Sequence, residues 1–363
     1  MTTLKPTRFT TRYGVDHPVA SAGMAFASMT PELPAAVSQA GGIGSLANVG
    51  FFPPALLQQM VGGIRALTAK PFNINFITCF VEPAIIDMAV ALKPSSVSFH
   101  WGAPKPEWTA ALKATGIDVW EQVGTVAEAV RAFESGVDVV IAQGSEAGGH
   151  NYGSMSTLAL VPAVRHALRH QFPEAIVLAA GGIVDGAGLA AALCLGADGA
   201  WVGTRFLATH ESQAHPEWKR RLVAAEGFET TRTHVFGRHH ADFNPMRVLR
   251  NRVVREWDAR VADIPADNSA EIEIGRMDVW GQPTALRKFQ NLAPMGGREG
   301  GAEGGAGGDF EELPLLCGEG VSGVRDIAPA AEVLHRMVSE AAEILAALSP
   351  VNSNSISNRK ESK

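Results

Sequence analysis

Short apolar runs alternate with longer amphipathic stretches along the first 206 residues of the chain. Residues 137–142 and 176–180 are nearly all apolar, which is typical of parallel strands buried on both faces. The stretches between the runs carry apolar residues at helical spacing, and Thr125 with Glu128 forms a capping-box pattern at the start of one of them. The runs that we predict as strands are Val19 to Ala22, Gly42 to Ala47, Phe72 to Phe76, Ser96 to Trp101, Asp118 to Gln122, Val137 to Gln143, Ile176 to Ala180 and Gly199 to Val202.

Eight strand-and-helix units in succession predict the fold of this part of the chain. Each amphipathic stretch can cross over and lay the next strand parallel to the last, and eight such units close into a (β/α)8 TIM barrel. The rival topology is an open doubly wound sheet, which does not need eight consecutive units. We therefore expect an α/β protein whose barrel occupies residues 1–206.

The alternation of strands and helices stops after residue 206. We interpret residues 207–320 as a mostly helical insertion that follows the eighth strand and covers the barrel mouth as a substrate lid. Within it, the glycine tract at 296–308 buries too little surface to offset its chain entropy, so we expect a mobile loop. Apolar residues then return at helical spacing, and residues 321–349 are predicted to form a closing C-terminal helix that packs back on the barrel. The polar residues 350–363 are expected to form a disordered tail.

The composition narrows the classes of function. Of the 363 residues, 46% are hydrophobic and 19% are charged, which is ordinary for an α/β protein with a continuous core. The formal net charge of −6 and the lack of a basic stripe argue against nucleic acid as a partner. No apolar run reaches membrane-spanning length, so we expect a cytoplasmic protein with no membrane partner. The three cysteines are widely spaced and indicate neither a disulfide framework nor a zinc site.

The segment Gln143-Gly144-Ser145-Glu146-Ala147-Gly148-Gly149-His150 follows directly on a predicted strand. An ionisable imidazole therefore emerges at the carboxyl end of a strand, where a TIM barrel holds its catalytic groups. The glycines let the backbone approach a flat ligand closely and adopt positive φ. The alternative is a structural turn that ends in a surface histidine. We treat His150 as the candidate catalytic base.

Small residues also end the next two predicted strands. Gly181 and Gly182 follow one of them, and Gly203 and Thr204 follow the other. Adjacent backbone N–H groups without partners bind phosphate, and barrels commonly hold a phosphate after strands seven and eight. Thr204 adds a hydroxyl donor. Because both strand ends are in register with His150 one strand earlier, the sequence predicts a phosphate site beside the candidate base.

Six short motifs occur in one order along most of residues 15–212, and they are Ala40 to Gly44, Phe72 to Phe76, Ser98 to Pro104, Ala142 to His150, Ala179 to Ile183 and Gly203 to Phe206. In this order the motifs resemble those of the nitronate monooxygenase family, formerly called 2-nitropropane dioxygenases. Thr231-Arg232-Thr233 and Gly318-Glu319-Gly320-Val321 are also similar to elements of that family. On these motifs the chain is identified as a member of it.

The resemblance implies a barrel that binds FMN noncovalently and uses His150 as the base on the substrate. Members of the family oxidise alkyl nitronates, and some of them neutral nitroalkanes, with dioxygen to a carbonyl compound and nitrite. A buried Asn75 or Gln143 also has a plain interpretation as a satisfied core amide, and Met24 as a core filler. The residues that the resemblance assigns to FMN are Gly23, Met24, Ala25, Asn75, Gln122, Gln143, Gly148, Gly181, Gly182, Trp201, Val202, Gly203 and Thr204.

The chain departs from the family pattern beside the candidate base. Asn151 and Tyr152 separate His150 from Gly153, where many relatives have a single residue, and Gly124 stands where a serine is common. The longer segment puts the shape of the substrate pocket in doubt. Tyr152 is either a substrate contact or an exposed loop aromatic.

A second histidine-rich segment contains His234, His239 and His240. It lacks carboxylate or thiolate partners at ligand spacing, which favours a solvated basic loop over a metal site. We therefore expect no metal.

Two other functions remain open on the same pattern. One is an FMN-dependent reductase that takes hydride from NADH or NADPH and delivers it to a quinone or an enoyl thioester. The other is a flavin-free barrel that binds a sugar phosphate and acts as an isomerase or lyase. The sequence does not determine the physiological substrate or the oligomeric state.

Overall fold

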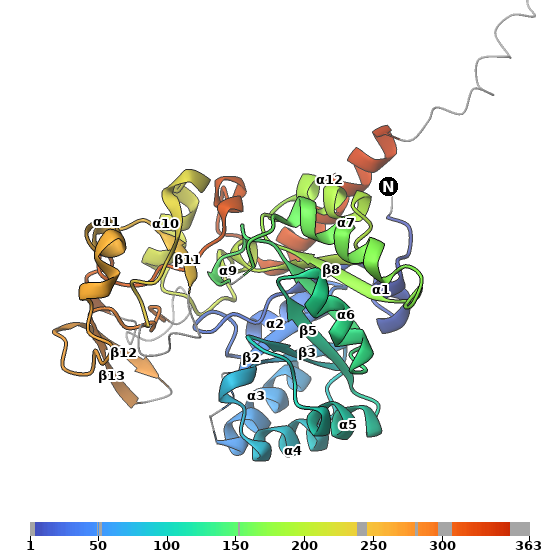
Figure 1. Cartoon of the computed structure of the whole chain (residues 1–363), viewed down its shortest axis with the longest axis horizontal. Helices are drawn as coiled ribbons and strands as arrows, with labels where there is room; N and C mark the ends of the chain where they lie inside the picture. Colours follow the sequence, from blue (N-terminus) through green and yellow to red (C-terminus); the bar gives the residue numbers. More distant parts are fainter. Residues whose placement is uncertain are drawn as a thin grey trace, which may run out of the picture.

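Eight parallel strands form the central sheet of the molecule (Figure 1). The computed structural model describes residues 4–48, 50, 53–151, 153–237, 245–279, 282–296 and 307–348. Hydrogen-bonded neighbours in the sheet follow the order β1-β9-β8-β6-β5-β4-β3-β2. The bounds of these strands are β1 Val19–Ser21, β2 Gly44–Asn48, β3 Phe72–Ile77, β4 Ser96–His100, β5 Asp118–Val123, β6 Val139–Gln143, β8 Ile176–Ala180 and β9 Gly199–Val202.

The sheet closes on itself between β1 and β2. The Ser21 N–H donates to the Ile43 carbonyl over 2.9 Å, and the Ile43 N–H donates to the Val19 carbonyl over 3.0 Å. A parallel bridge pairs Ala20 with Ile43 between these two bonds. The predicted (β/α)8 barrel is therefore confirmed, and every predicted strand is present with ends that differ by at most two residues.

Helices surround the barrel between successive strands. Thr125 caps α6 as predicted, because its side chain accepts from the Glu128 N–H while the Glu128 carboxylate accepts from the Thr125 N–H. The helix that directly follows β9 is the short α9. The outer layer is completed by α12, which packs against α8 and α2. The bounds are α2 Glu32–Gln39, α3 Pro54–Leu67, η1 Thr78–Phe80, α4 Pro83–Leu92, α5 Pro106–Ala114, α6 Val126–Glu134, α7 Thr157–Leu168, α8 Gly186–Cys194, α9 Thr204–Leu207 and α12 Ala330–Leu348.

The interior of the barrel is filled with side chains and closed at its amino-terminal end. Trp120 and Trp201 pack inside the barrel with aliphatic residues of the other strands. Helix α1, Arg8–Tyr13, lies across this end and inserts Phe9, which is fully buried. The Tyr13 hydroxyl donates to Asp118 over 2.7 Å and accepts from the Trp120 indole N–H over 2.6 Å. The amino-terminal end is thus a packed core, which leaves the opposite end for a ligand.

The prediction of a mostly helical insertion is wrong, because the segment after α9 contains two small antiparallel sheets. One has the strand order β10-β11-β7 and the other the order β13-β12-β14. The pairings of β7 with β11 and of β14 with β12 join strands far apart in sequence, which local patterns do not reveal, whereas β12 and β13 form a local hairpin. The bounds are β7 Gly149–His150, α10 Pro216–Ala224, η2 Gly227–Glu229, β10 Thr230–Thr233, β11 Met246–Leu249, α11 Arg252–Trp257, η4 Asp258–Asp263, β12 Glu273–Val279, β13 Gln282–Arg287, β14 Gly307–Gly308 and η5 Glu319–Gly323.

The inserted segment lies to one side of the barrel, with α10, α11 and the β12–β13 hairpin forming the yellow and orange lobe of Figure 1. The predicted closing helix is present as α12, although it begins at Ala330. Most of the glycine tract at 296–308 and the predicted tail at 350–363 lie outside the described residues, as do Tyr152, His239 and His240. Among the described helices, none has both the length and the hydropathy that crossing a membrane requires.

Candidate active site

A cavity opens at the carboxyl ends of the barrel strands, on the side that faces the inserted segment. Its volume is about 1190 Å³ when the open solvent at its mouth is included. The carboxyl ends of the eight barrel strands and the loops after them form its floor and walls, and the inserted segment contributes the remaining wall.

The cavity brings together the residues that the sequence singled out, with one exception. Those that line it are His150, Gly23, Met24, Ala25, Asn75, Gln122, Gln143, Gly148, Gly181, Gly182, Trp201, Gly203 and Thr204. Val202 does not line it and is only 1% exposed, in the core between strands and helices. Because side chains alternate along a strand, Trp201 points into the barrel and Val202 points away from it. Val202 is therefore the one residue assigned to FMN whose side chain does not line the cavity, and its role stays a prediction.

His150 lies on a short strand rather than on an irregular turn. It belongs to β7, which pairs antiparallel with β11 so that His150 faces Met246. The Gln143 side-chain amide donates to the His150 carbonyl over 3.2 Å. The indole ring of Trp101 meets the imidazole edge-to-face, with ring centroids 5.0 Å apart and ring planes at 70°. Backbone and side chain of His150 are thus held by three different elements.

The loop between β6 and His150 is braced from within and from outside. The fully buried Asn151 donates through Nδ2 to the carbonyls of Ser145 and Ala147, over 2.8 Å each. Arg247 of β11 donates to the Ser145 carbonyl as well and pairs with the Glu319 carboxylate over 2.9 Å. Asn151, the first of the two residues that depart from the family pattern, therefore closes the loop that carries the candidate base.

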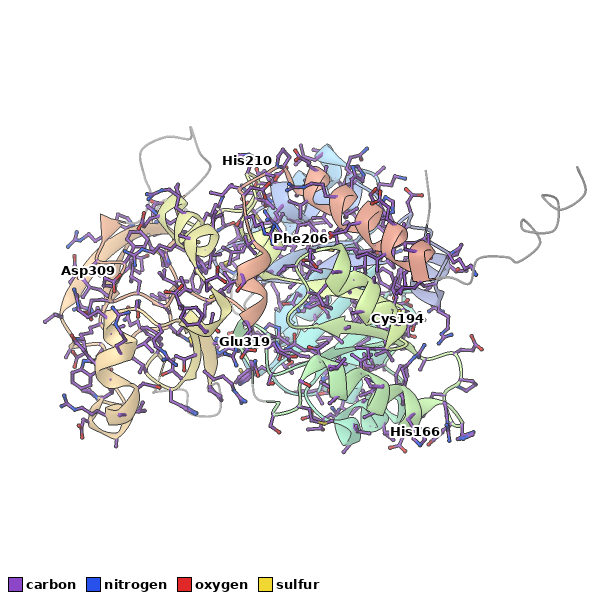
Figure 2. The ribbon with its side chains drawn as sticks, turned by 90° about the horizontal axis from the view of Figure 1, so that it is seen from above. His166, Cys194, Phe206, His210, Asp309 and Glu319 are labelled. Carbon is purple, nitrogen blue, oxygen red and sulfur yellow. The ribbon has the colours of Figure 1, made fainter. Side chains whose placement is uncertain are left out.

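Glu319 lies between the barrel and the inserted lobe (Figure 2), and its segment contacts this loop. Its N–H donates to the Glu146 carbonyl over 2.9 Å. A Cβ at Gly148 would lie 2.4 Å from the Cys317 carbonyl carbon, and a Cβ at Gly320 would lie 2.8 Å from the Gly182 carbonyl oxygen. Only residues without a side chain allow such close approach, which explains glycine at both positions.

Two glycines with positive φ form the end of β8. Gly181 has φ of 105° and Gly182 has φ of 74°, in the region that favours glycine. The Thr204 Oγ1 accepts from the Gly318 N–H over 2.9 Å, which leaves its proton available to another acceptor. Within the described residues, no intramolecular acceptor is found for the backbone N–H groups of Gly181, Gly182, Gly203 and Thr204. These four N–H groups lie along one wall of the cavity and together suit an anion.

Side-chain amides line the opposite wall. Asn75 is 4% exposed and donates through Nδ2 to the Ser98 hydroxyl over 2.8 Å. Its Oδ1 lies beside Gly23, where a Cβ would approach to 2.2 Å. Gln122 and Gln143 are also buried and line the cavity. Amides can donate and accept at once, which suits a ligand whose edge carries both kinds of group.

His100 is a second histidine on the cavity wall, at the end of β4. Burial lowers its pKa to about 4, so the imidazole is neutral at pH 7. His100 belongs to the motif Ser98 to Pro104, but no role at the site was predicted for it. The signal was its position at the end of a predicted strand, the same signal that identified His150.

Other wall residues come from the inserted segment and were missed. Trp218 of α10, Asn291, Leu316 and Cys317 line the cavity together with Gly318. Burial raises the pKa of the Cys317 thiol, so it stays protonated at neutral pH. No local pattern marks Trp218 or Asn291, because only the folding of the inserted segment over the barrel places them at the cavity.

Comparison with known proteins shows which family the chain is similar to. The family model described as nitronate monooxygenase matches residues 7–84 and 81–340. A nitronate monooxygenase of Pseudomonas aeruginosa is 33% identical over 92% of this chain and 98% of its own length. A Rhodococcus jostii protein named (3aS,4S,5R,7aS)-5-hydroxy-7a-methyl-1-oxo-octahydro-1H-indene-4-carboxyl-CoA dehydrogenase is 37% identical over 71% of this chain and 69% of its own.

Solved structures agree with the fold over nearly the whole chain. FabK from Thermotoga maritima has a TM-score of 0.74 at 29% identity and covers 95% of this chain and 99% of its own. A nitroalkane oxidase from Streptomyces ansochromogenes has a TM-score of 0.72 at 27% identity, with coverage of 94% of this chain and 100% of its own.

Proposed function

Because the chain belongs to the nitronate monooxygenase family, we propose that it oxidises alkyl nitronates with dioxygen to a carbonyl compound and nitrite, with FMN bound in the cavity and His150 as the base. Family membership makes the chain an oxidoreductase that acts on a small molecule. The observation that carries the finer proposal is the cavity itself, in which His150 shares one space with an anion-binding wall and an amide wall.

The donor set of the cavity suits FMN. The N–H groups of Gly181, Gly182 and Gly203 suit its terminal phosphate, and the Thr204 hydroxyl can add a further hydrogen bond. The amides of Asn75 and Gln143 suit the mixed donor and acceptor edge of its ring system. When bound, FMN supplies the electron transfer between the nitronate and dioxygen.

The proposed role of His150 is to remove the α-proton of a neutral nitroalkane. The proton moves to an imidazole nitrogen, and the electron pair of the C–H bond moves into the nitro group, which gives the nitronate. An imidazole ordinarily titrates near neutral pH, where a general base works best. His100 is a poor candidate for this step, because its pKa of about 4 makes it a weak base.

The inserted segment completes the site as a lid in this proposal. Trp218 and Leu316 face the cavity with largely apolar surface, while Asn291 adds one polar group. Such a wall excludes water from the reacting pair and strengthens the electrostatic interactions within the cavity. Nitronates carry their negative charge on the nitro oxygens, so a dry cavity with a few donors suits them.

The experiment that tests the proposal is a spectrum of the purified protein followed by two assays. We expect a yellow protein that releases FMN on denaturation, identified by chromatography against FMN and FAD standards. Oxygen uptake with a short-chain nitronate should be rapid and should produce nitrite. A colourless protein without flavin would instead support a phosphate-binding isomerase or lyase.

A second candidate is a flavin-dependent enzyme that acts on a thioester. It is favoured by the 37% identity to the relative whose name describes a CoA ester dehydrogenase. Anaerobic mixing separates the two candidates. Rapid bleaching of the bound flavin by NADH or NADPH supports a reductase, whereas bleaching by the nitronate alone supports the monooxygenase.

A further inference from the structure

Trp101 holds an unusual backbone conformation at the end of β4. Its φ is 67°, in the left-handed region that bulky residues seldom adopt, and Gly102 follows with φ of 115°. The Thr78 hydroxyl lies 2.9 Å from the carbonyl oxygens of both His100 and Gly102 and donates to them across this turn. Backbone strain of this kind persists only where surrounding contacts enforce it, and it is concentrated at functional sites.

The left-handed conformation of Trp101 changes the direction of the chain after β4. β4 ends at His100, and an extended continuation would carry the next side chain away from the barrel mouth. The left-handed residue instead bends the chain so that consecutive side chains reach the site: His100 lines the cavity, and Trp101 meets the imidazole of His150. A glycine at 101 would relieve the strain but would leave His150 without this contact.

The Trp101 ring supports His150 from behind. Trp101 is 7% exposed and packs with Ile77, Ala25 and Phe80. Its indole meets the imidazole at a centroid distance of 5.0 Å and an angle of 70°, a favoured arrangement for two aromatic rings. Of the described residues, those that line the cavity include His100 and His150 but not Trp101. The indole therefore contacts the candidate base without contacting the space that substrate would occupy.

We infer that Trp101 is a positioning residue that fixes the plane of the His150 imidazole against the substrate carbon. The inference rests on the proposed function, because it needs His150 to act as the base. The strained backbone is retained because the ring at this position orients the imidazole, and proton abstraction requires that orientation to be held. Turnover of a preformed nitronate, which has already lost its α-proton, does not depend on it.

The test compares Trp101→Gly, Trp101→Phe and Trp108→Leu. Trp101→Gly removes the ring and suits the left-handed backbone, so the fold should tolerate it. Trp101→Phe keeps a ring in place. Trp108 is a matched control, because it is 6% exposed, stacks on Phe99 and is not among the residues that line the cavity.

Two measurements are made on each variant. The first is the NMR spectrum of the His150 imidazole in histidine-labelled protein, assigned by its loss in His150→Ala. The second is kcat and KM with a neutral nitroalkane and with the corresponding preformed nitronate. The spectrum reports, through the ring current of the indole, whether Trp101 contacts the imidazole, and it does so whether or not the protein turns over substrate; the kinetic difference between the two substrates reports the orientation.

We expect Trp101→Gly to shift the His150 signals and to lower kcat on the neutral nitroalkane by about 10- to 100-fold. KM should change little, because the indole does not line the cavity, and turnover of the nitronate should be largely kept. Trp101→Phe should restore most of the lost kcat, and Trp108→Leu should leave the His150 signals and kcat unchanged.

Failure of the inference about Trp101 can be distinguished from failure of the proposed function. Unmoved His150 signals in Trp101→Gly, or an equal loss of kcat in Trp108→Leu, would overturn the inference about Trp101 alone. If His150→Ala turns over the neutral nitroalkane at the normal rate, the proposed function is wrong and the positioning role falls with it, whatever the spectra show.

Discussion

Two histidines lie on the cavity wall, and the pKa of one of them is strongly lowered. Desolvation lowers the pKa of His100, at the end of β4, to about 4, and both His100 and His150 on the short strand β7 are half-buried. Both histidines line one cavity. In the proposed function, the low pKa of His100 leaves the proton transfer to His150 and keeps His100 neutral at pH 7.

The role of His150 predicts a difference between substrates. Replacing it with alanine should lower turnover of neutral nitroalkanes by about 10²- to 10⁴-fold, because a general base typically contributes that much. Activity on a preformed nitronate should be less affected, and flavin should stay bound, since the phosphate wall is intact. Steady-state kinetics on both forms of one substrate, beside the flavin content of the variant, checks this. Equal losses on the two forms would contradict a role in proton transfer.

The proposed phosphate site predicts a loss of cofactor when its glycine is replaced. Gly182→Leu should raise the dissociation constant of FMN by about tenfold or more, because the new side chain occupies the space where the phosphate approaches the backbone. Gly136→Leu is the matched control, since both glycines have positive φ, 74° and 86°, but nothing lies within 4 Å of a Cβ at Gly136. Flavin retained equally by both variants would show that the phosphate does not approach Gly182.

Among the secondary-structure elements, the short strand β7 and the helix α12 do the most to join distant parts of the chain. β7 ties the loop of the candidate base to β11 of the inserted segment, and Arg247 adds its bonds to Ser145 and Glu319. α12 returns from the inserted segment to pack against α8 and α2. The Glu340 carboxylate of α12 accepts from the Gly186 N–H at the start of α8 over 2.8 Å. The barrel and the inserted segment are therefore linked on two sides.

The packing of α12 predicts a stability difference within one helix. Leu334 is fully buried, so Leu334→Ala should lower the free energy of unfolding by about 2–5 kcal/mol. Leu348 is 74% exposed in the same helix, and Leu348→Ala should change it by less than about 0.5 kcal/mol. Denaturant unfolding of both variants measures the difference. Similar values for the two would mean that α12 does not contribute to the core of the barrel.

For the whole molecule, burial of His100 couples folding to pH. An unfolded histidine binds its proton near pH 6.5, whereas His100 in the folded chain stays neutral until about pH 4. The unfolded state therefore binds more protons between these values, so the stability present above pH 6.5 is lost as the pH falls toward 4.

The size of this effect predicts a measurable pH profile. The contribution of His100 is at most about 3 kcal/mol, from a pKa difference of roughly 2.5 units. In His100→Gln, the free energy of unfolding should fall less between pH 7 and pH 4.5 than it does in the unmodified chain. Denaturant unfolding at several pH values checks this, and parallel profiles for the two proteins would rule out a pKa shift at His100.

The alternation of apolar runs was enough to predict the eight strands of the barrel, because each strand and its crossover helix are local patterns that a parallel sheet repeats. Strand ends were also predictable, since His150 and the glycines at 181 and 182 directly follow apolar runs. Val202 was included in a range carried over from family motifs, although side chains alternate along a strand and its own does not line the cavity.

Only the tertiary structure determined which side chain contacts the His150 imidazole and which residues of the inserted segment line the cavity. Trp101, which follows β4, contacts His150 on β7. Trp218 and Asn291 reach the cavity from the inserted segment, which joins the barrel through the non-local pairing of β11 with β7. Such contacts depend on which distant residues the fold brings together, and no local period of apolar residues encodes them. The chain by itself therefore determined the barrel and the position of its base, whereas long-range packing determined how that base is held and what covers it.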